Sequence, residues 1–138
     1  MLYSKTAKYA VLALSEVAIS GSQEPVSTKQ IAEAAAVPYP LLAKIVSQLR
    51  RAGLLHAARG KHGGILLTRP ACEIMIRDVV VALDGEDVLT DCPLFLQPCG
   101  CDRECALHPL WSPARDAVVR FMETTTVEDV AQARLAHK

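Results

Sequence analysis

The chain has 138 residues, of which 51% are hydrophobic, and its 15 Lys and Arg residues balance 15 Asp and Glu residues. A chain of this length can bury a sizeable core. No apolar run approaches the roughly 18 residues that cross a bilayer, and the first residues lack a secretory leader pattern. We therefore expect a soluble, cytoplasmic protein with no membrane partner.

The balanced total charge conceals two different halves. Residues 1–70 contain nine Lys or Arg and three Glu, a net charge of +6. Residues 71–138 contain six Lys or Arg and twelve Asp or Glu, a net charge of −6. Solvated charge without a partner is one explanation of this division. Binding of nucleic acid by the first half is the other, because the local charge governs such encounters.

The first half is predicted to hold three helices, over residues 4–20, 27–37 and 40–53. Apolar side chains recur in them at three- and four-residue spacing. Ser27 has the position of an N-cap at the start of the second helix, and Pro40 suits the first turn of the third.

The third helix separates apolar from polar side chains. Leu42, Ile45, Val46 and Leu49 share one face, and Lys44, Ser47, Gln48 and Arg51 point away from it. A solvated helix face is the simpler explanation of the polar set. Two short helices joined by a tight turn, the second with a basic outer face, are also typical of a helix-turn-helix.

A predicted β-hairpin follows this third helix. The β-prone runs 54–58 and 65–68 flank a segment with three glycines, which permit a sharp turn. A helix-turn-helix followed by a basic hairpin forms a winged helix. Arg59 is the best candidate for a minor groove, and its neighbours in the turn are candidates for phosphates. The predicted DNA-contacting residues are Tyr39, Pro40, Lys44, Gln48, Arg51, Arg59, Lys61 and His62.

The second half is predicted to hold a helix over residues 73–83, a cysteine-rich loop and two further helices. The helix after the loop carries an apolar stripe, and the last helix runs from Thr126 to about Arg134. The stripe consists of Leu110, Ala114, Ala117, Val118 and Phe121. A face of this kind predicts packing against another apolar surface.

Four of the five cysteines lie between Cys92 and Cys105, and His108 follows three residues later. Thiolates at this spacing can converge on an iron–sulfur cluster or on zinc, or they can form a disulfide under oxidation. The residues alone leave these three alternatives open. Cys72 stands apart and is expected to be a small buried hydrophobic residue.

Four motifs together resemble the Rrf2-type bacterial transcription factors, almost end to end. The motifs are Ser4-Lys5-Thr6-Ala7-Lys8-Tyr9-Ala10-Val11, Leu49-Arg50-Arg51-Ala52-Gly53-Leu54, Arg59-Gly60-Lys61-His62-Gly63-Gly64 and Cys105-Ala106-Leu107-His108-Pro109-Leu110-Trp111. The resemblance implies a fold that is mainly α with a small β-hairpin wing, a winged helix-turn-helix followed by a long C-terminal dimerisation helix. It implies a DNA-binding domain over residues 1–70 and a dimerisation region over 71–138, with the cluster-binding loop at about 86–108. It also implies a homodimer, in which the apolar stripe of the helix after the loop packs across the two-fold axis.

The same resemblance implies a ligand set for an iron–sulfur cluster. Cys92, Cys99, Cys105 and His108 match the pattern of the iron–sulfur assembly regulators, with one additional residue between the first two. This branch holds a 2Fe–2S cluster, which is therefore favoured, whereas a nitric-oxide-sensing branch holds a 4Fe–4S cluster with an acidic residue of the partner's first helix. Lys8 occupies the nearby position here. Cys101 lies outside the pattern.

The sequence thus predicts a homodimeric regulator that binds a double-stranded DNA operator under control of an iron–sulfur cluster sensing iron, redox or nitric oxide status. A zinc- or thiol-based regulator and an iron–sulfur carrier are the alternatives. An enzyme is not expected, because the chain has no cofactor-binding glycine fingerprint and no catalytic dyad. Pro38, Pro40 and Ala43 replace the serine and glutamate of the assembly regulators, so the operator need not be the familiar one.

Overall fold

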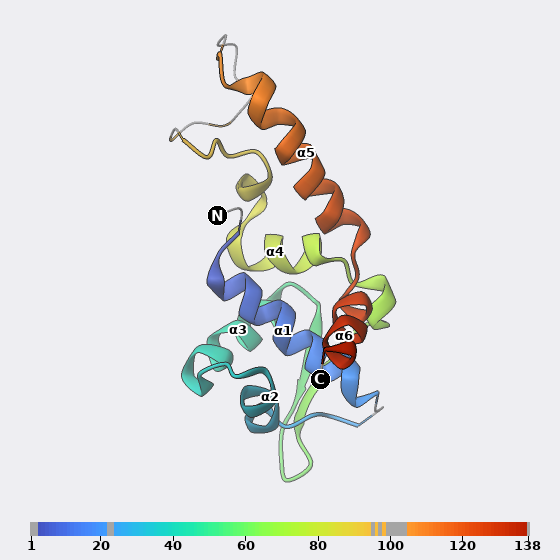
Figure 1. The fold of residues 1–138 in the computed structure, drawn as a ribbon. Helices are drawn as coiled ribbons and strands as arrows, with labels where there is room; N and C mark the ends of the chain where they lie inside the picture. Colours follow the sequence, from blue (N-terminus) through green and yellow to red (C-terminus); the bar gives the residue numbers. More distant parts are fainter. Residues whose placement is uncertain (1–2, 22–23, 95, 97, 99–104, 138) are drawn as a thin grey trace.

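The computed structural model describes residues 3–21, 24–94, 96, 98 and 105–137, and it is mainly helical with one β-hairpin (Figure 1). This confirms the predicted fold class. The helices are α1 (Lys5–Ser20), α2 (Thr28–Ala35), α3 (Tyr39–Arg51), α4 (Ile76–Asp84), α5 (His108–Thr124) and α6 (Val127–Ala136). The strands are β1 (Leu55–Ala58) and β2 (Gly64–Leu67), and short 3₁₀ turns occupy η1 (Ala71–Glu73) and η2 (Glu86–Leu89). No helix in the described ranges is long and apolar enough to span a bilayer.

Helix α1 forms the centre of the body and packs against α2, α3, α4 and α6 (Figure 1). The Ser4 side chain caps it by accepting from the Ala7 amide at 3.0 Å, and Gly21 ends it in the left-handed conformation. Its apolar side chains are enclosed on several sides, as in a helix at the middle of a small core. They include Ala7, Ala10, Val11, Ala13, Leu14 and Val17.

The predicted start of the fourth helix at residue 73 is wrong by one turn. Ile74 and Met75 are extended, and Met75 forms an isolated antiparallel bridge with Thr126. The Ile76 amide donates to the Thr125 carbonyl at 2.9 Å, and the Val127 amide donates to the Ile74 carbonyl at 2.8 Å. Pairing with the α5–α6 junction therefore overrides the helical pattern of this segment.

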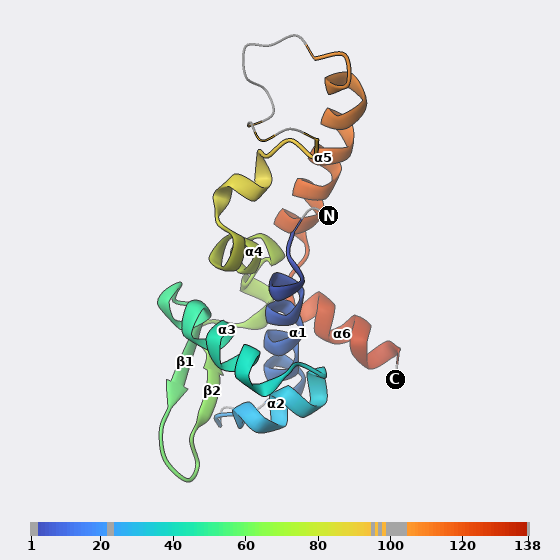
Figure 2. The same ribbon diagram turned by 90° about the vertical axis from the view of Figure 1, so that its left-hand side faces the viewer.

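Helix α6 returns to the body and packs against α1, which it crosses at an angle (Figure 2). A guanidinium nitrogen of Arg134 is 2.6 Å from Glu16 Oε1, and another donates to Ser15 Oγ at 2.7 Å. The Glu16 contact is ionic rather than an aligned hydrogen bond. A weaker 3.4 Å bond from Arg134 to the Ala34 carbonyl extends the link to α2. One side chain thus joins the last helix to the first two.

The chain leaves the body after α4 and returns through the C-terminal end of α5. We call η2, the described residues of the cysteine segment and residues 108–121 of α5 the arm. Figures 1 and 2 show the arm projecting from the body on the side opposite the hairpin. At its base, the Ser4 amide donates to Asp84 Oδ2 at 2.7 Å and the Ser4 hydroxyl donates to Asp84 Oδ1. Met122 is the one buried residue of α5.

Candidate functional site

Helix α3 presents its polar side chains to solvent. Leu42, Ile45 and Leu49 are fully buried, and they fix the rotation of the helix on the body. All the DNA-contacting residues predicted in α3 are exposed, and the exposed fraction of Tyr39 is 55%. These residues are Tyr39, Pro40, Lys44, Gln48 and Arg51. Sequence reasoning missed Arg50, which is also exposed in the last turn of α3.

The turn between α2 and α3 depends on a left-handed residue that the sequence does not signal. Ala36 has φ of 56°, and the Val37 amide donates to the Ala32 carbonyl at 3.0 Å. A left-handed alanine is strained, since its Cβ crowds the backbone. Glycine is the usual residue here, so the sequence predicted the turn but not its left-handed residue. The turn sets α3 across α2, as in a helix-turn-helix.

The hairpin pairs Leu55 with Leu67 and Ala58 with Gly64 in an antiparallel register. It is held to the body by an isolated bridge between Val26 and Ile65, with hydrogen bonds of 2.9 and 2.8 Å. A Cβ on Gly64 would lie 2.3 Å from the Val26 carbonyl oxygen. Only glycine permits this close approach, which sets the direction of the wing.

Three cationic or potentially cationic side chains lie at the wing tip, and all are exposed. They are Arg59, Lys61 and His62. No acidic residue occurs between Glu33 and Glu73, a stretch that includes both α3 and the wing. The candidate nucleic-acid interface therefore combines an exposed polar helix face with a basic hairpin, and no carboxylate from this stretch opposes an approaching phosphate.

The described residues of the cysteine segment lie at the opposite end of the molecule from the wing (Figures 1 and 2). Cys92 is half-buried and Cys105 is exposed, and both are free thiols. The His108 amide donates to the Cys105 carbonyl at 3.1 Å, so these two residues are one turn apart at the start of α5. Cys99 and Cys101 lie outside the described residues. Among the described residues, no three His, Cys, Asp or Glu side chains gather as a metal site.

The prediction that Cys72 is buried is wrong. Its thiol is free and exposed in η1. The surrounding turn buries Ile74 instead, because the extended residues after it pair with the α5–α6 junction. Cys72 is therefore an accessible thiol outside the cysteine segment.

Known proteins resemble this chain both in sequence and in fold. Residues 3–133 match the family model Rrf2, described as an iron-dependent transcriptional regulator. The chain belongs to the Rrf2 family. This membership confirms the predicted resemblance and a transcriptional regulator rather than an enzyme.

Individual Rrf2 relatives are identical to this chain at about a third of the aligned residues. The regulator IscR of Photorhabdus laumondii is 32% identical over 94% of this chain and 79% of its own length. The protein rrf2 of Nitratidesulfovibrio vulgaris is 31% identical, over 94% and 87% respectively. The solved structure of CymR, the global cysteine regulator of B. subtilis, matches with a TM-score of 0.80 and 31% identity, over 94% of this chain and 95% of that one.

Proposed function

We propose that this Rrf2-family regulator binds duplex DNA as a homodimer and that an iron–sulfur cluster in the cysteine segment controls this binding. The observation that carries the DNA-binding part is the exposed, acid-free surface formed by α3 and the wing. Lys44, Gln48 and Arg51 of α3 would meet a major groove, together with Tyr39 and Pro40 at its N-terminal end. Lys61 and His62 would meet phosphates, and Arg59 would enter a minor groove.

A homodimer is supported by the exposed apolar face of α5. Leu110 is 76% exposed and Phe121 is 51% exposed, although both are large apolar side chains on one helix. Their burial by a second copy would remove this surface from water. Two wings and two α3 helices would then contact half-sites about one helical turn apart, roughly 34 Å.

The donor chemistry of the cysteine segment fits a cluster. Cys92 and Cys105 are unpaired thiols at the two ends of the segment, and His108 adds an imidazole one turn after Cys105. Cys92, Cys99, Cys105 and His108 would hold the cluster, with 2Fe–2S favoured over 4Fe–4S. A cluster supplies a centre that responds to iron supply, oxidants or nitric oxide. The chain's own part is to carry any change in this segment into α5, which begins at His108.

The alternatives are a zinc site with the same ligands and a thiol switch without metal. Both use the cysteines, but neither retains acid-labile sulfide. An iron–sulfur carrier is the more distant alternative, and it would not bind duplex DNA with a steep dependence on salt. The membership in a family of transcriptional regulators argues against the carrier.

Metal analysis of the anaerobically purified chain tests the cluster. We expect iron with acid-labile sulfide in the wild-type protein, and loss of both in Cys92→Ala, Cys99→Ala and Cys105→Ala, because an iron that loses a thiolate is open to solvent. Cys72→Ser is the matched control, since it removes an exposed free thiol far from the segment along the chain. Cys101→Ala should also retain the cluster.

Three results would change this proposal. Stoichiometric zinc without sulfide would replace the cluster by a structural metal. Neither metal nor sulfide, with a disulfide that forms on oxidation, would favour the thiol switch. Loss of the cluster in Cys101→Ala with retention in Cys99→Ala would reassign the second ligand.

A further inference from the structure

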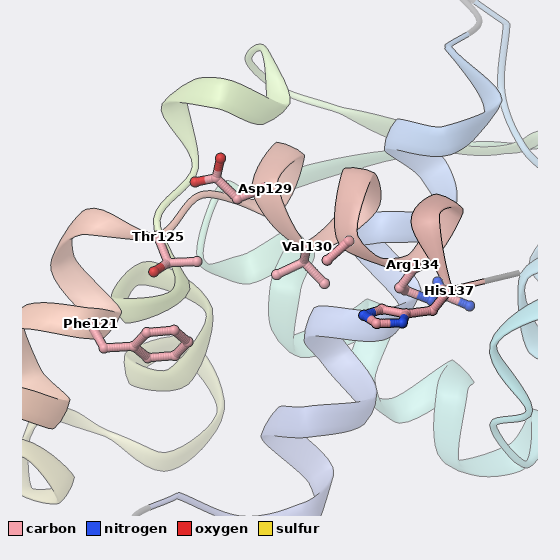
Figure 3. A pocket seen from close by; sticks show the side chains of 7 residues that line it. Phe121, Thr125, Asp129, Val130, Arg134 and His137 are labelled. Carbon is pink, nitrogen blue, oxygen red and sulfur yellow. The ribbon is translucent and has the colours of Figure 1, made fainter.

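The groove between α5 and α6 carries charged side chains that are already paired within the chain. Its volume is about 490 Å³, and Arg134 and Asp129 are among the residues that line it (Figure 3). Arg134 contacts Glu16 and donates to Ser15, and Asp129 exchanges hydrogen bonds with Thr126. Neither charge is therefore left for a ligand, and an unpaired polar group has to be sought elsewhere in the molecule.

Two buried side-chain atoms among the described residues lack an aligned hydrogen bond. One is Glu16 Oε1, which a guanidinium nitrogen of Arg134 contacts at 2.6 Å. The other is the indole Nε1 of Trp111, which has no polar partner among the residues that the structure describes. An indole N–H can only donate, and native proteins nearly always give a buried donor an acceptor. The Trp111 nitrogen therefore indicates that an acceptor approaches it in the functional protein.

Trp111 lies on the face of α5 that its own chain covers. Half-buried positions recur at His108, Trp111, Arg115 and Val118, and they lead to the buried Met122. Intervals of three and four residues place these side chains on one face of the helix. Val118, which the sequence analysis placed on the exposed stripe, packs instead against the core. The indole thus shares its face with the imidazole of His108.

This face begins among the proposed cluster ligands. The His108 amide donates to the Cys105 carbonyl at 3.1 Å, and Trp111 follows His108 by three residues, one further turn of helix. Figures 1 and 2 show α5 on one side of the arm and η2, with the described residues of the cysteine segment, on the other. The buried donor therefore lies in the part of the molecule where the proposed ligands lie, far from the wing.

We infer that the indole N–H of Trp111 donates a hydrogen bond to a sulfur atom of the iron–sulfur cluster or of its thiolate ligands, an inference that rests on the cluster proposed above. These sulfur atoms carry negative charge, and hydrogen bonds to them are one of the means by which a protein sets the reduction potential. The bond gives the buried indole its acceptor. Trp111 is then a positioning residue rather than a ligand, because it acts through the sulfur and not on the iron.

The bond has two consequences for the proposed sensor. Reduction adds negative charge to the cluster, so the N–H group stabilises the reduced form more than the oxidised form and raises the reduction potential. His108 and Trp111 also attach the cluster to α5 at two points, one turn apart. A change in the cluster therefore acts on the first two turns of this helix together.

A single isotope label tests the bond directly. Trp111 is the one tryptophan of the chain, so tryptophan labelled with ¹⁵N at the indole marks one side chain. Electron–nuclear double resonance of the one-electron-reduced cluster, in the full chain purified anaerobically, should show coupling to the indole ¹⁵N and to an exchangeable proton. The His108 nitrogens remain ¹⁴N and do not contribute to the ¹⁵N signal. This spectrum needs no variant, so it decides the inference even where a substitution fails to hold the cluster.

Trp111→Phe keeps an aromatic ring and removes the donor. We expect this variant to retain iron and acid-labile sulfide, to lose the coupling to the exchangeable proton, and to have a lower reduction potential than the wild type in a redox titration followed by visible absorption. Ser112→Ala is the matched control, since it removes a hydroxyl from the neighbouring half-buried position and should keep the wild-type potential.

The failure of this inference differs from the failure of the cluster. A wild-type cluster without the indole coupling, or an unchanged potential in Trp111→Phe, would overturn the hydrogen bond and leave the cluster standing. A wild-type chain without acid-labile sulfide would overturn the cluster itself and the hydrogen bond with it.

Discussion

The body and the arm treat their apolar residues in opposite ways. In the body, the stripe of α3 and the centre of α1 are enclosed, and the exposed side chains are largely polar or charged. In the arm, Leu94, Leu96, Leu110 and Phe121 are exposed. The body therefore buries its own apolar core, whereas the arm leaves large apolar side chains exposed that a second molecule would cover. The two halves of the sequence also differ in net charge. Residues 1–70, which contain α3 and the wing, carry +6, and residues 71–138, which contain the arm, carry −6.

This difference between the body and the arm indicates which kind of partner each surface suits. A basic surface on a self-sufficient body suits a polyanion, which requires no burial of apolar area. An exposed apolar face on a projecting helix suits protein association, in which such burial supplies the free energy. The two surfaces lie at opposite ends of the molecule, so any signal between them must pass through the body.

The largest expected effect comes from breaking the link between α6 and α1. Arg134→Met leaves Glu16 buried without its cation, and removing one partner of a buried pair costs about 3 kcal/mol or more. Urea unfolding followed by circular dichroism measures the loss. Adding Glu16→Gln removes the unpaired charge and should recover part of it. An unchanged unfolding free energy in Arg134→Met would show that α6 contributes little to the body.

The next largest effect on stability is expected from a substitution in the wing. Gly64→Ala places a Cβ 2.3 Å from the Val26 carbonyl oxygen, so the bridge that holds the hairpin must open. We expect a cost of about 1–3 kcal/mol, typical of forced overpacking, and weaker DNA binding. Gly60→Ala is the matched control. Its φ of 101° is also strained for alanine, but nothing lies within 4 Å of the new Cβ. Equal costs for the two variants would attribute the effect to strain rather than to the close contact.

The cations of the wing should separate into two kinds. Lys61→Ala should weaken binding to every duplex by a similar factor and reduce the log–log salt slope by about one, as expected for a phosphate contact. Arg59→Ala should penalise the operator, selected from a random duplex pool, more than scrambled DNA, because groove width depends on sequence. Titrations at several salt concentrations measure both. Equal losses on both duplexes for Arg59→Ala would make it a phosphate contact, and no loss on either would remove the wing from the interface.

The smallest expected effect concerns pH. The Thr126 amide donates to Asp129 Oδ2 at 2.8 Å, and the Asp129 amide donates in return to the Thr126 hydroxyl. The pKa of the Asp129 carboxyl is lowered in the folded chain, first by the hydrogen bond from the Thr126 backbone and then by the Thr126 side chain. A lowered pKa stabilises the fold above the carboxyl's ordinary value of 3.8, and this contribution disappears as the pH falls below it. Asp129→Asn should therefore reduce the pH dependence of the unfolding midpoint below about pH 5. The same pH profile in both proteins would contradict this assignment.

Local patterns predicted most of the elements, because their causes are local. The α3 stripe, the glycine-rich turn of the wing and the cap at Ser27 each depend on residues a few positions apart, and each has its expected place. Ile74 and Met75 were misjudged because their segment pairs with Thr125 to Val127, some fifty residues later. The exposure of Cys72, in the 3₁₀ turn just before them, was misjudged as well. Ala36 gave no signal at all, since a left-handed alanine is set by the surrounding helices.

The sites were predictable to different depths. The outward direction of Lys44, Gln48 and Arg51 follows from helical spacing, so the sequence already defined that face. The ligand set of the cysteine segment followed from family resemblance and stays a prediction, with Cys99 outside the described residues. The exposed apolar face of α5 depends on which side of that helix the body covers. Sequence spacing alone assigned Val118 to the exposed side, and only the folded core places it on the other.

The contact of Ser4 with Asp84 has a consequence for local opening. It joins the N-cap of α1 to the last residue of α4, just before the arm, and Met122 provides the second attachment where the arm returns. The arm is thus a segment attached at both ends to the body, which we expect to unfold as one cooperative unit. Amide hydrogen exchange in the single chain should be slow in the core helices α1, α4 and α6 and faster in the first turns of α5. Opening of the arm can therefore proceed without unfolding the body.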